Sequence, residues 1–291
     1  MSSRRVTTIL TYSVLIFACM VSFSLPQFLP SISSAATQKG GKPAVILVAG
    51  IVRDFSADHP DFDVTPGNGY GHVMGNIRRF LDKDGKPVFR GGGFRVSKEW
   101  RDKDSNKICY SLFDLSRGDS AGSTGKMDRG AITSTETFSQ WFRDVPGVNI
   151  SKTYAFNAHL NKDGTYVYET NDFFPIDGAL NGNGPDNHNY YFTFEVAGTF
   201  VHDESADHMF EFKGDDDVWV FIDGKLVADL GGIAGNEEQF VELNRLGLVD
   251  GKTYTLKFFM GERHQPQSNF RFSTTVELAT YVLPTVTASY D

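Results

Sequence analysis

The second half of the chain is a succession of short apolar segments, each closed by turn-forming residues. After residue 150 these segments are "KTYAFNAHL", "GTYVYET", "NYYFTFEVAGTFV", "HMFEFKG", "DVWVFIDG", "KLVADLGG", "KTYTLKFFMGER" and "NFRFSTTVEL". Short runs of this kind are typical of β-strands, and the connections "NKDG" and Asp223-Gly224 favour tight hairpins. The spacing predicts a mainly β fold, an antiparallel β-sandwich, because no helix-sized segments alternate with the strands.

The first half of the chain combines one strong strand signal with candidate helices and long loops. "AVILVAGIVRDF" (44–55) is rich in β-branched residues and predicts a strand. "HVMGNIRRFLD" (72–82) is compatible with a short helix. "TETFSQWFRDV" (135–145), with Thr135 as its cap, predicts a helix whose aromatic stripe packs into the core. We expect one domain over 44–280, with one or two short helices and long loops.

The N-terminus has the pattern of an export signal. Arg4 and Arg5 precede an apolar stretch from about Val6 to Leu25, and small residues follow where a signal peptidase could cut. We therefore expect a signal peptide over 1–36 and a linker over 37–43, with 281–291 as a tail. The apolar stretch approaches membrane-spanning length, so an uncleaved anchor is the main alternative. Lipidation at Cys19 and twin-arginine export fit less well.

Charge and cysteine content narrow the function further. The formal charge is -8, from 28 basic and 36 acidic residues. That sign argues against a nucleic-acid-binding surface and is compatible with cation binding. With Cys19 inside the expected signal, Cys109 is alone, so no intrachain disulfide is expected in the exported form. Such a domain must be held together by its core, by metal, or by both.

Three aspartates stand side by side, Asp215, Asp216 and Asp217, directly before the apolar run "VWVFI". Adjacent carboxylates repel each other and resist desolvation, and a bound hard cation such as calcium would compensate them. Neighbouring residues of a regular strand point to opposite faces, so a shared ion needs a distorted backbone at this point. The alternative is an acidic turn in which Asp217 caps backbone amides.

A second polar stretch, "GERHQPQSNFRF" (261–272), lies between two apolar strands. It offers binding groups at Glu262, Arg263, His264, Ser268 and Asn269, although an ordinary loop with a local Glu–Arg pair has the same composition. "DKDSNK" (102–107) begins like a helix-loop-helix calcium loop but lacks that motif's glycine and final acid. We found no zinc-type histidine spacing, phosphate loop or nucleophile elbow.

These stretches together resemble the fibro-slime domain, a family of exported bacterial and slime-mould extracellular modules. The resemblance extends over about residues 46–278. It rests mainly on "VRDFSADHPDFD" (52–63), "FSQWFRDVPGVN" (138–149), "FKGDDDVWVFIDGKLVADLGG" (212–232) and "GERHQPQSNFRF" (261–272). The fibro-slime domain is in turn similar to the anthrax protective-antigen (PA14) β-sandwich, a group that includes yeast adhesin lectins and carbohydrate-binding modules.

The resemblance implies a calcium site. In the adhesin branch an aspartate pair joined by a cis peptide holds calcium, and calcium contacts sugar hydroxyls; the matching residues are Asp215 and Asp216. Asp217 takes a place that is often glycine, and Asn269 is the candidate for a further ligand. The glycines of "DLGG", Gly231 and Gly232, fall in the ligand-binding stretch. Where the fibro-slime pattern has histidine two residues later, this chain has Ala234.

The expected function is calcium-dependent carbohydrate binding by an exported, non-catalytic module, secreted or at the cell surface. The expected partner is a carbohydrate or glycoconjugate and not a nucleic acid, with membrane contact only through an uncleaved N-terminal segment. Two alternatives remain open. One is a structural matrix or slime protein with a stabilising calcium site. The other is a glycan-cleaving enzyme, which needs two carboxylates across a cleft, for example Asp216 and Glu262.

Overall fold

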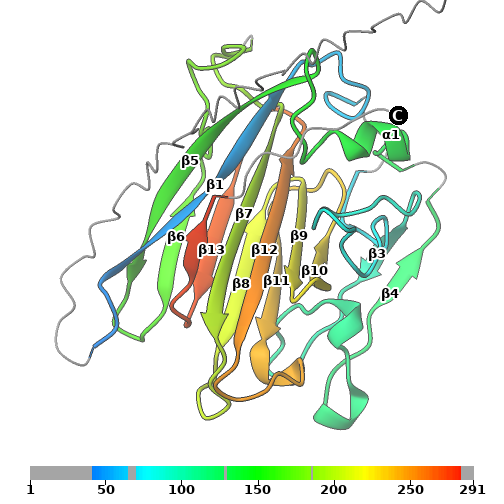
Figure 1. Cartoon of the computed structure of the whole chain (residues 1–291). Coiled ribbons are helices and arrows are strands. Elements are labelled where there is room, and N and C mark those ends of the chain that lie inside the picture. The colour runs from blue at the N-terminus through cyan, green and yellow to red at the C-terminus, as the bar shows by residue number, and fades with distance from the viewer. Residues whose placement is uncertain (1–40, 65–69, 128–129, 185, 283–291) are drawn as a thin grey trace, which may run out of the picture. The chain divides into compact units, whose positions relative to one another are not determined.

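The computed structural model describes residues 41–64, 70–127, 130–184 and 186–282. Within them, an eleven-stranded antiparallel sheet folds over into two facing layers (Figure 1). The first layer contains, in order, β10 (Lys225–Leu230), β9 (Asp217–Ile222), β12 (Thr253–Glu262), β7 (Phe192–Val201), β1 (Val45–Phe55) and β5 (Asn149–Leu160). The second contains β6 (Tyr166–Thr170), β13 (Phe270–Thr274), β8 (Met209–Gly214) and β11 (Glu237–Glu242), and β14 (Ala279–Tyr281) pairs with β7. The predicted β-sandwich is confirmed.

The layers are joined where β5 turns into β6, the hairpin predicted at "NKDG". Only two residue pairs connect these strands, His159 with Val167 and Leu160 with Tyr166. The core between the layers is rich in aromatic residues. Phe212 of β8 stacks on Phe258 of β12, with ring centroids 5.3 Å apart. Aromatic packing of this kind supplies the burial that a domain without a disulfide needs.

A second apolar cluster covers the outer face of the first layer. Trp219 and Phe221 of β9 pack there against Phe138 and Trp141, which belong to α1 (Thr135–Ser139) and the residues after it. Because Val218 and Val220 of β9 face the inter-layer core, both faces of this strand are buried. This double burial is why the segment after the triple aspartate is continuously apolar and does not alternate.

Two local predictions need correction. The helix expected over 72–82 is instead the short strand β2 (Val73–Met74), which joins β3 (Phe94–Lys98) and β4 (Ser123–Gly125) in a small sheet. Gly75 follows with φ +73, a conformation that ends any helix there. The helix at 135 is one short turn, and its cap is Ser134, whose hydroxyl accepts from the Thr137 amide at 3.1 Å.

The remaining elements are the 3₁₀ turns η1 (Tyr110–Leu112), η2 (Leu115–Arg117) and η3 (Leu243–Arg245). Of the tail, β14 forms an edge strand up to Tyr281. The expected signal peptide over 1–36, most of the linker and the last nine residues of the tail lie outside the described residues. Among the helices that are described, none has the length and apolarity to cross a bilayer.

Candidate functional site

Strand register brings the two polar stretches to one end of the sandwich. Gly261 of β12 pairs with Asp217 of β9, and Phe270 of β13 pairs with Gly214 of β8. The turn from β8 into β9 therefore lies between the end of β12 and the start of β13. The segment after β10 closes the same end, because the Ala234 carbonyl accepts from the Asp216 amide at 3.1 Å. The triple aspartate, the 261–272 stretch and the segment after "DLGG" thus form one site.

Asp215 fastens two loops together. One carboxylate oxygen accepts from the Asn236 amide at 2.6 Å. The other accepts from the Asn269 backbone amide at 2.9 Å and from its side-chain Nδ2 at 2.5 Å. Asn269 therefore lies beside the aspartates, as its position in the chain predicted. In this orientation it presents a donor to Asp215, and an oxygen ligand would require rotation of the side-chain amide by half a turn.

Asp216 provides the backbone distortion, although not through a cis peptide. Among the described residues the cis peptide bond is Gln265-Pro266, so the cis Asp215-Asp216 bond implied by the adhesins is absent from this pair. Instead Asp216 has φ +55, in the left-handed region that aspartate tolerates better than most residues. Its Oδ2 accepts from the Arg263 amide at 2.6 Å. This kink allows Asp215 and Asp216 to line the same pocket.

Asp217 is a buried counter-ion and not a ligand. The guanidinium of Arg263 contacts its Oδ2 through Nε and Nη2, each at 2.6 Å, and the Gly232 amide donates to Oδ1 at 2.6 Å. Arg263 is itself fully buried over the Trp141 ring, 5.0 Å from the centroid. We therefore remove Asp217 from the predicted metal ligands and Arg263 from the predicted ligand-binding residues.

Glu262 is the unusual group of the site. It is fully buried beside the Asp216 carboxyl and the Ser268 hydroxyl, yet neither of its oxygens has a well-formed hydrogen bond. Burial, together with the negative charge of Asp216, raises the pKa of Glu262 well above its usual range. Burial also raises the pKa of Asp216 to about 7, against the opposing effect of Arg263. Two neighbouring carboxyls in this condition need a shared proton or a cation.

A pocket of about 150 Å³ opens above the aspartates. Sequence reasoning picked out Asp215, Asp216 and His264 among its lining residues and noted Ala234. It missed several others, of which Tyr70 is the farthest away in the chain. Missed lining residues are Tyr70, Ile233, Gly235, Gln265, Pro266 and Gln267. Tyr70 packs edge-on against His264, with ring centroids 5.4 Å apart. The glutamines stood in a stretch already suspected, whereas nothing in the sequence connects Tyr70 to it.

Three further residues predicted to touch ligand are buried supports. The Ser268 hydroxyl donates to the Phe173 carbonyl at 2.8 Å and is fully buried. Gly231 and Gly232 pack against a neighbouring loop so closely that a side chain would collide. A Cβ on Gly231 would lie 2.6 Å from Asn76 Nδ2, and one on Gly232 2.5 Å from the Gly71 carbonyl oxygen. These glycines are needed for close backbone approach and are not placed to contact a ligand.

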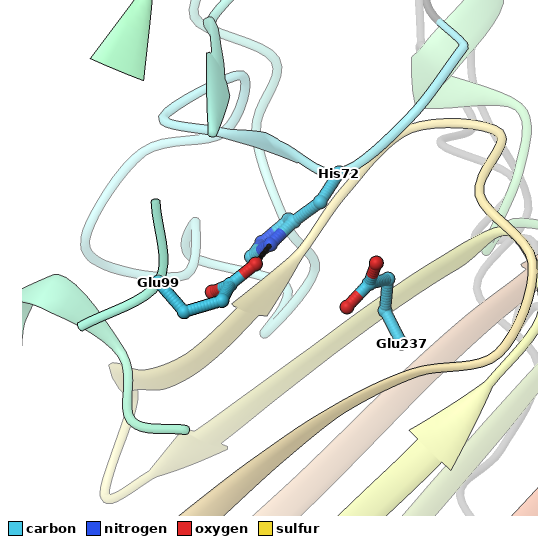
Figure 2. Close-up of side chains that lie close together, drawn as sticks. All are labelled: His72, Glu99 and Glu237. Carbon is cyan, nitrogen blue, oxygen red and sulfur yellow. Dashed lines mark hydrogen bonds and ion pairs between the residues drawn. The ribbon is translucent and has the colours of Figure 1, made fainter. Parts of the chain in front are cut away.

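A separate cluster of His72, Glu99 and Glu237 has metal-ligand chemistry, with one possible ligand atom from each lying within 4.8 Å of the others (Figure 2). The candidate ligands already have partners. His72 Nδ1 lies 2.9 Å from Glu99 Oε1, His72 Nε2 lies 2.9 Å from the Asp229 carbonyl, and Lys107 Nζ contacts Glu237 at 2.7 Å. Two acceptors on one imidazole favour the doubly protonated ring. The cluster is therefore an ion-pair clasp that attaches residues 70–74 to β10.

Comparison with known proteins agrees with this architecture. Residues 144–288 match the model of the PA14 domain. Protein psiD of Dictyostelium discoideum is 32% identical over 247 residues, which cover 80% of this chain and 42% of psiD. Protein psiN of the same organism is 36% identical over 255 residues, covering 79% of this chain and 30% of psiN. The chain thus carries a PA14-related domain. It belongs with the fibro-slime type of that family, which the psi proteins represent.

Solved structures are more distant. One is an A domain of a subtype-switched epithelial adhesin from Candida glabrata, in complex with beta-lactose. The match covers 81% of this chain and 88% of the adhesin chain, at 14% identity and a TM-score of 0.28. A beta-glucosidase from Kluyveromyces marxianus in complex with glucose covers 32% of this chain and 11% of its own, at 16% identity and a TM-score of 0.24. Scores this low establish neither a shared fold over the matched length nor a shared ligand.

Proposed function

We propose that this protein is an exported, non-catalytic module that binds carbohydrate through a calcium ion. The observation that carries the proposal is the pair of buried, neighbouring carboxyls of Asp216 and Glu262 below a solvent-open pocket. Without a cation, one or both must hold a proton at neutral pH, because burial and mutual repulsion disfavour two charges there. A divalent cation in that position would satisfy both groups.

The donor set is suited to calcium. Calcium takes six to eight oxygen ligands, from carboxylates, amide carbonyls and water. Asp215, Asp216 and Glu262 offer carboxylate oxygens, and Asn269 offers its amide oxygen after rotation of the side chain. No histidine or cysteine is among these donors, which argues against zinc. A bound calcium ion supplies open coordination positions that vicinal sugar hydroxyls can occupy in place of water.

The arrangement is poor for glycoside hydrolysis. Hydrolysis of that kind uses two carboxyls on either side of the scissile bond, about 5 Å or more apart. Glu262 is fully buried beside the Asp216 carboxyl and is not among the residues that line the pocket. A sugar ring has no room between them. The pocket instead lies to one side, where a bound sugar would be held and released unchanged.

A structural role for the ion is the second candidate, and Asp215 favours it. Its carboxylate ties Asn236 and Asn269 together, so an ion at this position would stabilise three loops with or without a sugar. The expected export also belongs to the proposal and rests on the N-terminal segment alone.

The experiment is a thermal melt of the purified protein, first stripped of metal, in calcium and in chelator. A ligand that binds only the folded state raises the midpoint. We expect calcium to raise the midpoint of the wild type and to leave Asp216→Asn unchanged. Asp223→Asn is the matched control, because Asp223 is an exposed aspartate with φ +50 in the β9–β10 turn.

The melt and a subsequent glycan screen separate the candidates. Equal midpoints in calcium and chelator would refute the calcium site. A calcium-dependent rise with no glycan bound in the screen would favour the structural matrix role.

A further inference from the structure

We propose that Tyr70 is the recognition residue of the pocket, against which the apolar face of a bound sugar ring packs. This inference rests on the proposed function, since it concerns the same pocket. Tyr70 lies outside the segment that matches the PA14 domain, residues 144–288. Tyr70 therefore comes to the pocket from outside the matched segment.

The backbone at Tyr70 is fixed relative to the acidic turn. Tyr70 forms a parallel bridge with Ile233, and the Gly71 amide donates to the Ile233 carbonyl at 2.7 Å. The next residue of that same segment, Ala234, accepts the hydrogen bond from the Asp216 amide at 3.1 Å. Tyr70 and Asp216 are thus held on opposite sides of one short stretch of backbone, so their separation is set by rigid elements.

The ion-pair clasp of His72, Glu99 and Glu237 also holds the backbone next to Tyr70 in place. His72 bonds both to Glu99 and to the Asp229 carbonyl, and the Val73 amide donates to the Gly231 carbonyl at 2.6 Å. Gly232 must be glycine for the Gly71 carbonyl to approach so closely. With the bond from Gly71 to Ile233, four hydrogen bonds or ion pairs hold residues 70–74 in place. They fix the position of the Tyr70 backbone beside the pocket.

The ring itself is available to a ligand. Tyr70 is half-buried and lines the pocket, and its T-shaped contact with the His264 ring can cover at most one of its two faces. Ile233, Ala234 and Pro266 continue the apolar wall. The pocket therefore has an apolar, partly aromatic side and a carboxylate floor, the combination of large apolar lining and few polar groups that small-molecule sites show. Ala234 stands where the resemblance expects histidine, so this part of the wall carries only a methyl group.

This geometry defines a class of ligand. The ligand must present vicinal hydroxyls to the calcium position and an unbroken patch of C–H groups to Tyr70. A pyranose ring does so when its axial and equatorial substituents leave one face free of hydroxyls. Sugars with a hydroxyl on each face should bind less well, because they would bury a polar group against the ring without a partner.

The test compares Tyr70→Ala and Tyr70→Phe with Tyr110→Ala, a control that removes an exposed tyrosine outside the pocket. The purified proteins are applied in calcium to agarose coupled with D-galactose, D-mannose, L-fucose or N-acetyl-D-glucosamine. Affinity for the free form of any retained sugar is then measured by calorimetry. We expect Tyr70→Ala to weaken binding at least tenfold and Tyr70→Phe by less than threefold. Tyr110→Ala should bind like wild type, and the calcium-induced rise in melting midpoint should be the same in all four proteins.

The outcomes are distinguishable. Wild-type affinity in Tyr70→Ala would overturn this inference and leave the proposed function standing. Loss of the calcium-induced rise in Tyr70→Ala would also overturn it, because Tyr70 would then support the fold and not the ligand. A wild type that no sugar column retains, in a glycan screen that is also negative, would overturn both proposals together.

Discussion

The guanidinium of Arg263 lies 2.6 Å from the carboxylate of Asp217, and both side chains are fully shielded from solvent. Arg263 and Asp217 directly follow Glu262 and Asp216 in the chain. The three neighbouring aspartates nevertheless have different partners. Asp215 binds loop amides, Asp216 faces the pocket beside Glu262, and Asp217 neutralises Arg263. A run that looks uniform in sequence is thus divided among three environments.

The buried pair predicts a large loss of stability when one partner is removed. Asp217→Asn would leave the Arg263 charge buried without its counter-ion, at a cost of about 3–5 kcal/mol in the free energy of unfolding. Urea denaturation in saturating calcium measures this cost. Asp223→Asn, in an exposed turn, should change stability by less than about 0.5 kcal/mol. A loss below about 1 kcal/mol in Asp217→Asn would contradict the assignment of Asp217 as counter-ion.

Glu262→Gln should move stability in opposite directions with and without calcium. In chelator the change removes a buried carboxyl whose pKa is raised well above its usual range by burial and by the charge of Asp216, so we expect the metal-free protein to gain stability at neutral pH. In calcium it removes a proposed ligand, so the calcium-induced rise in midpoint should shrink or vanish. Thermal melts under both conditions check this. A lower midpoint in chelator would show that Glu262 has a stabilising partner in the metal-free protein.

The raised pKa of Asp216 predicts how metal-free stability depends on pH. The folded-state pKa of about 7 lies above the unfolded value near 4, so the folded protein binds the extra proton between those values. Stability in chelator should therefore fall as pH rises from about 4 to 7, by roughly 1 kcal/mol per pH unit. Calcium competes with that proton and should flatten the slope. Urea titrations at pH 5, 6 and 7 measure it, and Asp216→Asn should reduce the slope in chelator.

Features of the fold that depend on neighbouring residues could be predicted from the sequence, whereas features that depend on residues distant in the chain could not. Period and turn chemistry are local, so the strands and the "NKDG" hairpin could be read directly. The continuous apolar run 218–222 also signalled a strand, but its second covered face requires the distant Phe138 and Trp141. The short helix expected over 72–82 failed because its backbone groups bond elsewhere: the Val73 amide to the Gly231 carbonyl, the Arg78 amide to the Val88 carbonyl and the Leu81 amide to the Gly224 carbonyl.

The site shows the same division. Composition marks Asp215–Asp217 and the 261–272 stretch as unusual, and the register of β9 with β12 brings them together. Which carboxylate faces the pocket and which is a counter-ion depends on Arg263, whose buried position follows only from the fold. Tyr70 could not be found, because its place in the pocket depends on contacts of residues 70–74 with the segment around Ile233, which is distant in the chain.

Cys109 should be inert in the folded protein. It is fully buried, and burial raises the pKa of its thiol to about 12. Because the thiolate is the reactive form, a thiol reagent at pH 8 should modify Cys109 only after unfolding. A Cys19→Ser background removes the other cysteine where the N-terminal segment is retained. Stoichiometric labelling under native conditions within minutes would show that the core around η1 opens readily.

The His72 clasp predicts a second pH effect that persists in calcium. Burial alone would lower the pKa of His72, but the hydrogen bond and charge of Glu99 outweigh it, so the folded pKa lies above the ordinary value of about 6.5. The clasp therefore contributes fully below that value and is lost as pH rises through the folded pKa. The groups around the ring are Glu99, the Asp229 carbonyl and carboxyl, and beyond them Lys107 and Arg101.

We therefore expect stability in saturating calcium to decline as the pH rises above about 6.5 and through the raised pKa of His72, where the ring loses its proton and one of its two hydrogen bonds. His72→Gln should remove most of this decline, and Glu99→Gln should shift it to lower pH, because the charge that raises the pKa of His72 is gone. Urea titrations across this range measure both variants. Equal slopes in wild type and His72→Gln would show that His72 is neutral in the folded protein. Because the clasp holds residues 70–74, sugar affinity through Tyr70 should weaken over the same pH range.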